Sequence, residues 1–325
     1  MPSHKNAAIV GCGNIAGFLD SPVDKHITTH AHAYKAHPET KLLAVCDPDI
    51  QKREAFISIW GEEIQGYDSL EELLAHEKID ILSICSPTSF HAEALKEALK
   101  DSTVSNILCE KPFVRSQEEL DTLLPLLYKS DKNILINFIR RYDPGVQTLK
   151  KTLASKELGE LLHFNASFTK GLYHNGSHML ELIEHLCGSI HSIKANKVIS
   201  KDEDLYGSFY LETALCHGTV QNESGENYSL FELELTLSKG RIRLTQSGHC
   251  IEIEDVQDSK RYPGYFVLEH KKTLDDSMHF NLFNALEYLL KDKGIDKTLQ
   301  EHLALSQKLL RIKQDLQTKH FLEFT

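Results

Sequence analysis

Residues 7–17 read AAIVGCGNIAG, a short apolar run that passes directly into a glycine-rich turn. The letters after the run fit G-x-G-x-x-A, the pattern that joins a strand to a helix in dinucleotide-binding folds. Gly11 permits a tight turn, Gly13 lets the backbone approach a pyrophosphate, and Ala16 lets helix and strand pack closely. The alternative is a glycine-rich loop that only turns the chain. The strand predicted before it and the helix predicted after it favour dinucleotide binding.

The first 140 residues alternate apolar runs with amphipathic stretches, which is typical of parallel βαβ units. Ser69, Ser89 and Ser116 are predicted N-caps of three of the helices. The predicted strands cover residues 7–12, 41–47, 79–85, 104–110 and 133–138, and the helices cover 48–59, 69–77, 89–100 and 116–129.

After Arg140 the pattern changes to longer alternating strands. A turn at residues 238–240 predicts antiparallel pairing of the strands on either side. The predicted fold class is therefore α/β, with an N-terminal Rossmann doubly wound parallel sheet (1–139) and a C-terminal α+β domain with an open, mostly antiparallel sheet (140–325). Its predicted helices cover 144–155, 177–186, 278–291 and 298–314, and its strands cover 161–169, 205–217, 230–237, 241–246 and 250–254.

Length and charge narrow the class of protein. The 325 residues are enough for two domains, and the net charge of -11 would repel phosphate backbones and anionic membrane surfaces. No window approaches the roughly eighteen apolar residues of a membrane span. Seven cysteines without a C-x-x-C pair favour a reduced, cytoplasmic protein over a disulfide or zinc framework. Nucleic acid and membranes are therefore not expected partners.

Asp47 ends the second predicted strand, where a carboxylate can accept hydrogen bonds from ribose hydroxyls. Pro48 and Asp49 follow it, and the first arginine is Arg53, which favours NAD over NADP. The alternative role for Asp47 is a helix N-cap, and the two roles could coexist.

Two further segments follow strand ends, SPTSFH at residues 86–91 and CEKPF at residues 109–113. An open α/β sheet binds ligands at this edge, and a lysine held there can exchange a proton with a hydroxyl. The alternative for Lys111 is a surface ion pair with Glu110. The predicted cofactor-binding residues are Gly11, Gly13, Asn14, Ile15, Asp47, Ser86, Pro87, Thr88, His91, Glu110 and Lys111.

Six motifs together resemble the glucose-fructose oxidoreductase, inositol dehydrogenase and MocA family of dinucleotide-dependent oxidoreductases. They are VGCGNIAG, HAHAYKAHPETKLLAVCD, SPTSFHAEALKEALK, CEKP, NFIRRYDP and NGSHMLELIEHLCG, in this order along the chain. The resemblance implies NAD(P)-dependent oxidation or reduction of a hydroxyl on a sugar, cyclitol or related molecule. It also implies a second domain whose open sheet supports a homodimer or homotetramer.

The resemblance assigns roles to individual residues. Lys111 matches the family's catalytic lysine, with Glu110 before it as expected. His178 matches the catalytic or substrate-orienting histidine, and Arg140 matches the arginine near nicotinamide and substrate. His174 stands where many members carry an acidic residue, so it cannot supply the negative charge that would help hold Lys111 protonated. This departure puts the usual proton relay, or the common substrate class, in doubt.

Other side chains around this helix have weaker assignments. Tyr142 and Asn175 are predicted to line the substrate cleft with His174, although packing explains them equally well. Asn175 and Gly176 predict that a helix begins near Ser177 and leaves His174 on a loop, so no metal site is predicted. A metal would otherwise suit the four spaced residues His174, His178, Glu181 and His185. Of the histidines near residue 30, His32 is interpreted as structural, and His26, His30 and His37 as surface residues.

Rival catalytic motifs are absent from the sequence: it has no G-x-S-x-G elbow, no phosphate loop and no H-E-x-x-H helix. Two alternatives to a dehydrogenase stay open. One is a redox-neutral NAD-dependent glycosidase or lyase. The other is a non-catalytic dinucleotide-sensing regulator, which His174 keeps open and the intact Glu110, Lys111 and Pro112 speak against.

Overall fold

The computed structural model describes residues 4–201, 204–224, 227–274, 278–291, 295–315 and 322–323. The chain forms two units, residues 1–139 with 279–307, and residues 140–278 with 308–325. The sequence-based division placed every residue after 139 in the second domain, whereas residues 279–307 pack with the first. The reason is that α8 (Asn281–Lys291) buries its apolar face against α1, β5 and β6. An amphipathic pattern shows that a helix has a partner but does not say which one.

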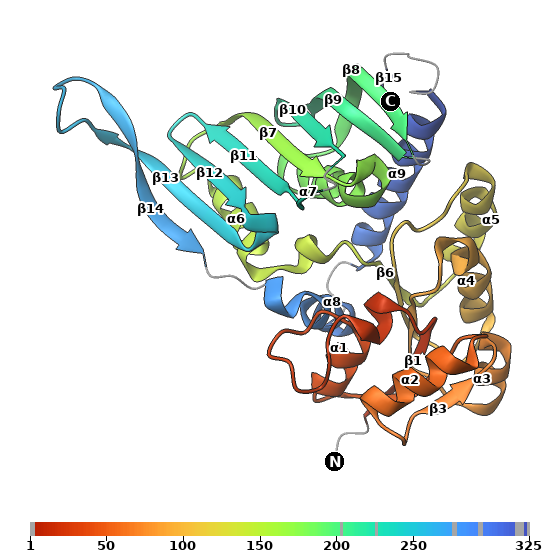
Figure 1. Cartoon of the computed structure of the whole chain (residues 1–325). Helices are drawn as coiled ribbons and strands as arrows, with labels where there is room; N and C mark the ends of the chain where they lie inside the picture. The colour runs from red at the N-terminus through yellow and green to blue at the C-terminus, as the bar shows by residue number, and fades with distance from the viewer. Residues whose placement is uncertain are drawn as a thin grey trace. The chain divides into compact units, whose positions relative to one another are not determined.

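The first unit contains a six-stranded sheet in the order β3-β2-β1-β4-β5-β6, with every neighbouring pair parallel (Figure 1). The predicted doubly wound sheet is therefore confirmed. The short strand β3 was not predicted, because three residues are too few to show a period. The strands are β1 (Lys5–Val10), β2 (Thr40–Cys46), β3 (Gln65–Tyr67), β4 (Ile81–Ile84), β5 (Asn106–Cys109) and β6 (Asn133–Ile136).

Helix caps follow the sequence at two of the three predicted positions. The hydroxyls of Ser69 and Ser116 each accept a hydrogen bond of 3.2 Å from the backbone N–H three residues on. Ser89 is not a cap, because it lies in a 3-10 turn (Thr88–Phe90) that precedes the helix. The helices of this unit are α1 (His30–Ala36), α2 (Ile50–Trp60), α3 (Leu70–His76), α4 (His91–Lys100), α5 (Gln117–Leu127), α8, and the first part of α9 (Ile295–Asp315).

The second unit contains a nine-stranded sheet in the order β14-β13-β12-β11-β7-β10-β9-β8-β15. Only β7 and β10 pair in parallel among these described strands, so the mostly antiparallel sheet is confirmed. The predicted strand 205–217 is wrong as one strand, because the chain turns after Thr213. The strands are β7 (Leu161–Thr169), β8 (Ile190–Lys201), β9 (Asp204–Thr213), β10 (His217–Glu223), β11 (Phe231–Leu237), β12 (Gly240–Thr245), β13 (Cys250–Asp258), β14 (Phe266–Leu274) and β15 (Leu322–Glu323).

Two helices, α6 (Pro144–Ser155) and α7 (Ser177–Cys187), lie on one face of this sheet (Figure 1). Nearly every residue of α7 is buried, and inward-facing residues of β7 and β11, such as Phe164 and Leu235, complete the core. This burial fixes the position of α7 on the sheet. None of the described helices is both long enough and apolar enough to cross a lipid bilayer.

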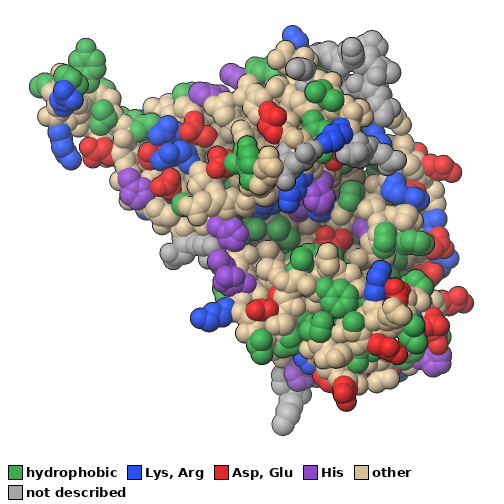
Figure 2. Space-filling model, in the orientation of Figure 1, with side chains coloured by type: hydrophobic (Ala, Val, Ile, Leu, Met, Phe, Trp, Pro, Cys, Tyr) green, Lys and Arg blue, Asp and Glu red, His purple; other side chains and the backbone are tan. Residues whose placement is uncertain are grey.

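At one edge, β13 and β14 extend beyond the rest of the sheet as a two-stranded arm (Figure 1). Figure 2 shows hydrophobic and basic side chains gathered at its tip. Tyr262, Tyr265 and Phe266 are 54%, 69% and 69% exposed there.

Candidate active site

The glycine-rich turn lies where the strand order of the first sheet reverses, between β1 and β4. Open α/β sheets bind ligands at this point. Gly11 follows β1 with φ of +90°, and its N–H donates to the carbonyl oxygen of Cys46 at 2.7 Å. A Cβ atom on Gly11 would lie 2.7 Å from the backbone nitrogen of Ser86. Only glycine therefore fits between the ends of the two strands.

Gly13 has the opposite surroundings. Its φ of -99° suits any residue, and an added Cβ would meet nothing within 4 Å. Beside Gly11, the buried hydroxyl oxygen of Ser86 has no hydrogen-bond partner within the described part of the chain. Buried polar atoms normally have a partner, and the open glycine leaves room for one. These two features fit the pyrophosphate of a bound dinucleotide.

The expected helix after the glycines is a single π-helical turn (Asn14–Phe18). Asn14 is exposed and Ile15 half-buried. Gly17 packs against the Phe56 and Trp60 rings, and its carbonyl oxygen accepts a 2.9 Å hydrogen bond from Trp60 Nε1. The helix expected after the glycines is therefore short, and the chain enters a loop after this turn.

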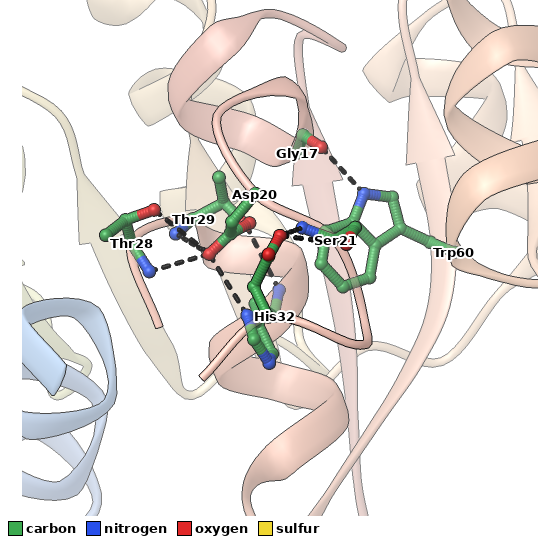
Figure 3. Close-up of polar contacts among 8 residues, drawn as sticks. Gly17, Asp20, Ser21, Thr28, Thr29, His32 and Trp60 are labelled. Atoms are coloured by element: carbon green, nitrogen blue, oxygen red, sulfur yellow. Dashed lines mark hydrogen bonds and ion pairs between the residues drawn. The ribbon is translucent and has the colours of Figure 1, made fainter. Parts of the chain in front are cut away.

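Asp20 holds that loop closed at its base (Figure 3). Its carboxylate accepts hydrogen bonds from the backbone N–H groups of Thr28 and Thr29 at 2.7 and 3.1 Å and from both hydroxyls. His32 Nδ1 lies 3.1 Å from the same carboxylate, and both of these side chains are at least nine-tenths buried. The structural interpretation of His32 is thus supported. No sequence pattern indicated the role of Asp20, because its partners are eight to twelve residues away.

Asp47 joins the end of β2 to the glycine turn. Its carboxylate accepts hydrogen bonds of 2.9 Å from the backbone N–H groups of Cys12 and Asp49. The helix N-cap is Asp49, which accepts from Gln51 and Lys52, so the capping alternative for Asp47 is wrong. A carboxylate has about four acceptor positions, which leaves capacity for ribose hydroxyls.

His91 links the two segments that follow β4 and β5. Its ring is buried, with Nε2 2.8 Å from the carbonyl oxygen of Ser86 and Nδ1 2.9 Å from that of Pro112. Burial lowers its pKa despite these hydrogen bonds. The geometry gives His91 a positioning role between the segments. Pro87 is exposed and Thr88 half-buried beside it.

Glu110 lies in a buried polar network. Its carboxylate is 3.0 Å from His30 Nε2 and accepts a 2.6 Å hydrogen bond from Asn137 Nδ2. His30 Nδ1 lies 2.8 Å from the Ser83 hydroxyl, which also contacts the Tyr34 hydroxyl at 2.7 Å. The interpretation of His30 as a surface residue was wrong, since it is only 1% exposed, and His37 is buried as well.

Burial by itself would raise the pKa of Glu110. The hydrogen bonds from His30 and Asn137 and the charges of His30 and Lys111 outweigh it, so the pKa lies below its ordinary value. Lys111 is half-buried at this edge of the sheet, and its charge acts on Glu110. Because the Glu110 carboxylate is buried, Glu110 and Lys111 do not form an ion pair at the protein surface.

Glu110→Gln should lower the free energy of unfolding by about 1–3 kcal/mol at neutral pH, because a neutral amide cannot replace the charged acceptor. The folded-state pKa is below the ordinary value of 4.5, so this stabilisation is present above pH 4.5 and lost as pH falls through the lowered pKa. Denaturant unfolding at several pH values should show wild type and variant converging in acid. Glu118→Gln, at an exposed position on α5, is the control and should show no such convergence.

In the second unit, residues Gly171–Gly176 form a π-helical turn that runs directly into α7. The expected start of α7 near Ser177 is confirmed, but His174 lies on this turn and not on a loop. Its side chain is exposed, Asn175 is half-buried, and His178 is 7% exposed on α7. Ser177 donates a 2.9 Å hydrogen bond to the carbonyl oxygen of His174, which connects the turn to the helix.

Arg140 is held within the second unit. Its guanidinium lies 3.5 Å from the centroid of the Phe231 ring, and Nη2 donates a 3.0 Å hydrogen bond to the Ser247 carbonyl oxygen. Burial lowers its pKa to about 10. These contacts anchor the Arg140 side chain within the second unit. Tyr142 is likewise buried, at 4% exposure.

The four spaced residues that could have suggested a metal have different surroundings. Glu181 forms a buried ion pair with Arg141, which the sequence did not indicate. His185 Nδ1 accepts a 3.1 Å hydrogen bond from Lys150 Nζ. Across the described residues, no group of three or more histidine, cysteine or acidic side chains is arranged to hold a metal ion.

Residues 5–138 match the oxidoreductase family with an NAD-binding Rossmann fold, named for glucose-fructose oxidoreductase, inositol dehydrogenase and MocA. The match covers the N-terminal Rossmann domain of the chain. The resemblance drawn from the six motifs is therefore confirmed, and NAD is the cofactor class of the domain.

Similarity to individual proteins agrees with this assignment. The chain is 28% identical over 132 residues to inositol 2-dehydrogenase of Rhizobium meliloti, covering 41% of this chain and 38% of that protein. It is 29% identical over 154 residues to D-glucoside 3-dehydrogenase of Escherichia coli, covering 47% and 40%. The chain spans about half or less of the length of the curated relatives it matches. The fold is similar to levoglucosan dehydrogenase in complex with NADH and L-sorbose, with a TM-score of 0.78, 13% identity and 99% of both chains covered.

Proposed function

We propose that this protein is an NAD-dependent oxidoreductase acting on a secondary hydroxyl or carbonyl of a sugar, cyclitol or sugar derivative, with NADP the less favoured cofactor. The observation that carries the proposal is the position of Lys111 after β5, beside the buried Glu110, at the carboxyl edge of an NAD-binding Rossmann sheet. Bound NAD supplies hydride exchange at its nicotinamide ring. The chain supplies position and proton transfer.

In this proposal each residue has a defined task. Gly11 and Gly13 shape the turn that receives the pyrophosphate, and Asp47 accepts from the ribose hydroxyls. Lys111 Nζ exchanges a proton with the substrate hydroxyl, and the buried α7 holds His178 to orient the reacting group. The remaining predicted cofactor and substrate residues, namely Asn14, Ile15, Ser86, Pro87, Thr88, His91, Arg140, Tyr142, His174 and Asn175, contact or support the bound molecules.

The substrate class is supported by the names of the relatives, inositol 2-dehydrogenase and D-glucoside 3-dehydrogenase. The test is the absorbance of reduced nicotinamide when the purified protein meets NAD or NADP and a panel of free sugars, cyclitols and nucleotide-linked sugars. We expect an NAD-dependent signal with one group of substrates. Cleavage of a glycoside without net cofactor reduction would instead indicate the glycosidase or lyase. Dinucleotide binding without turnover on the panel would favour the regulator.

We also propose that the protein forms a homodimer or homotetramer. The arm of β13 and β14 leaves Val256, Phe266, Val267 and Leu268 between 38% and 69% exposed. A two-stranded ribbon with little core of its own is marginally stable in water, so contact with another copy would stabilise it. Light scattering should give two or four times the chain mass of 36.9 kDa.

A cytoplasmic location is proposed because all seven cysteines are free thiols, as in a reducing compartment.

A further inference from the structure

Two cysteines of the second unit approach each other at a tightly packed junction. Cys187 is the last residue of α7, and Cys216 lies in the turn between β9 and β10. The backbone N–H of Leu215 donates to the carbonyl oxygen of Cys187 at 3.1 Å. Beside this contact, the end of α7 and the turn are so close that a Cβ on Gly188 would lie 2.8 Å from the Cβ of Ala214. The turn and the helix end are thus held together by backbone contacts.

The two thiol side chains lie close enough to affect each other's pKa, and both cysteines are free thiols. Cys187 is buried, whereas Cys216 is half-buried beside Leu215, which is 64% exposed. Thr213 Oγ1 lies 3.7 Å from Cys216 Sγ and accepts a 3.2 Å hydrogen bond from the Cys216 backbone N–H. The hydrogen bond from Cys187 lowers the pKa of Cys216 against the opposing effect of burial. Cys216 therefore combines access to solvent with thiolate character, the two requirements of a reactive cysteine.

The other cysteines lack this combination of features, so we expect an oxidant to react first with Cys216. Burial raises the pKa of the thiols of Cys12 and Cys46 to about 12, and it raises those of Cys85 and Cys109 well above their usual value. All four are buried, where a free thiol behaves as a small apolar residue. Cys250 is half-buried like Cys216, but the contacts described for it include no second cysteine.

We propose that Cys216 and Cys187 form a redox-active dithiol that a hydroperoxide converts to a disulfide. The Cys216 thiolate attacks the peroxide, the O–O bond breaks, and Cys216 becomes a sulfenic acid while the leaving oxygen takes a proton. Cys187 then loses its proton and attacks the Cys216 sulfur, the S–O bond breaks, and water leaves. Two thiols lose two electrons and two protons in all, and hydrogen peroxide is reduced to two waters. A dithiol reductant reverses the change.

The experiment treats the reduced full-length protein with hydrogen peroxide, blocks remaining thiols by alkylation, and maps peptides by mass spectrometry. We expect a linked Cys187–Cys216 peptide lighter by two hydrogen atoms, which disappears after reduction with dithiothreitol. Before oxidation, Cys216 should be alkylated about tenfold faster than Cys250 at neutral pH. Unlinked Cys187 and Cys216 after peroxide treatment, with both still alkylated as in the untreated protein, would overturn the proposal.

Variants separate the two steps. Cys216→Ser should abolish the linked peptide, and the matched control Cys250→Ser should leave it unchanged. Cys187→Ser should stop the reaction at the sulfenic acid, which dimedone labels on Cys216. If Cys187→Ser gives no such label, or if Cys250 is oxidised as fast as Cys216, the pair has no special reactivity. Circular dichroism checks that each variant is folded. The peptide map of the wild-type protein tests the proposal even if a variant does not fold.

Discussion

Lys111→Ala is expected to lower kcat by about 10²–10⁴-fold, the usual contribution of a positioned acid or base. A methyl group cannot exchange the substrate proton. The dissociation constant for NADH should stay near the wild-type value. The proposed pyrophosphate and ribose contacts come from the glycine turn after β1 and from Asp47 after β2, whereas Lys111 follows β5. The measurements are steady-state rates on the substrate found in the panel and a fluorescence titration with NADH.

Two controls identify the reason for a loss of turnover. Lys111→Arg keeps the positive charge but does not release its proton in proteins, so it should be almost as inactive as the alanine variant. Lys129→Ala removes an exposed lysine next to the end of α5 and should be as active as wild type. Equal turnover by Lys111→Ala and wild type would remove Lys111 from the mechanism. A parallel loss of NADH binding would make it a cofactor-binding residue.

Gly11→Ala is expected to destabilise the first unit by about 3 kcal/mol or more, from left-handed backbone strain together with overpacking. The residue has φ of +90°, and the new Cβ would lie 2.7 Å from the Ser86 nitrogen. Neither strand end can move without disturbing the parallel pair β1 and β4. Thermal unfolding followed by circular dichroism should show a Tm lower by about 5–10 °C. An unchanged Tm would show that the turn relaxes easily.

Gly13→Ala is the matched substitution with the opposite outcome. Its Cβ would meet nothing within 4 Å, so the Tm should be close to that of wild type. The same methyl group would occupy the space assigned to the pyrophosphate, so the dissociation constant for NADH should rise by about tenfold or more. Normal NADH binding by Gly13→Ala would place the pyrophosphate elsewhere. The two variants together separate folding from cofactor binding at one turn.

Features that depend on neighbouring residues followed from the sequence. The caps at Ser69 and Ser116 bond to residues three positions away, and the glycine turn is set by its own letters. The alternation of apolar runs was enough to predict the parallel sheet and the mostly antiparallel sheet. The ends of α6 and β7 were also predicted, because apolar periodicity and a proline mark them within a few residues.

Features that depend on distant residues did not follow. His30 was interpreted as a surface residue, yet it reaches Glu110, eighty residues away, and Ser83. Arg141 and Glu181 form their ion pair across forty residues. A single sequence carries no signal for such pairs, because a histidine or carboxylate shows the same local pattern whether or not it has a distant partner.

The sequence by itself determined the sheet types, the dinucleotide turn and the lysine at a strand end, since each is written in local periodicity and short motifs. Only the tertiary structure decided that residues 279–307 pack on the first unit, that Asp20 closes the loop after the glycines, and that a buried histidine supports Glu110. It also brought Cys187 and Cys216 together. The physical reason is that burial and charge pairing act between atoms close in space, whatever their separation along the chain.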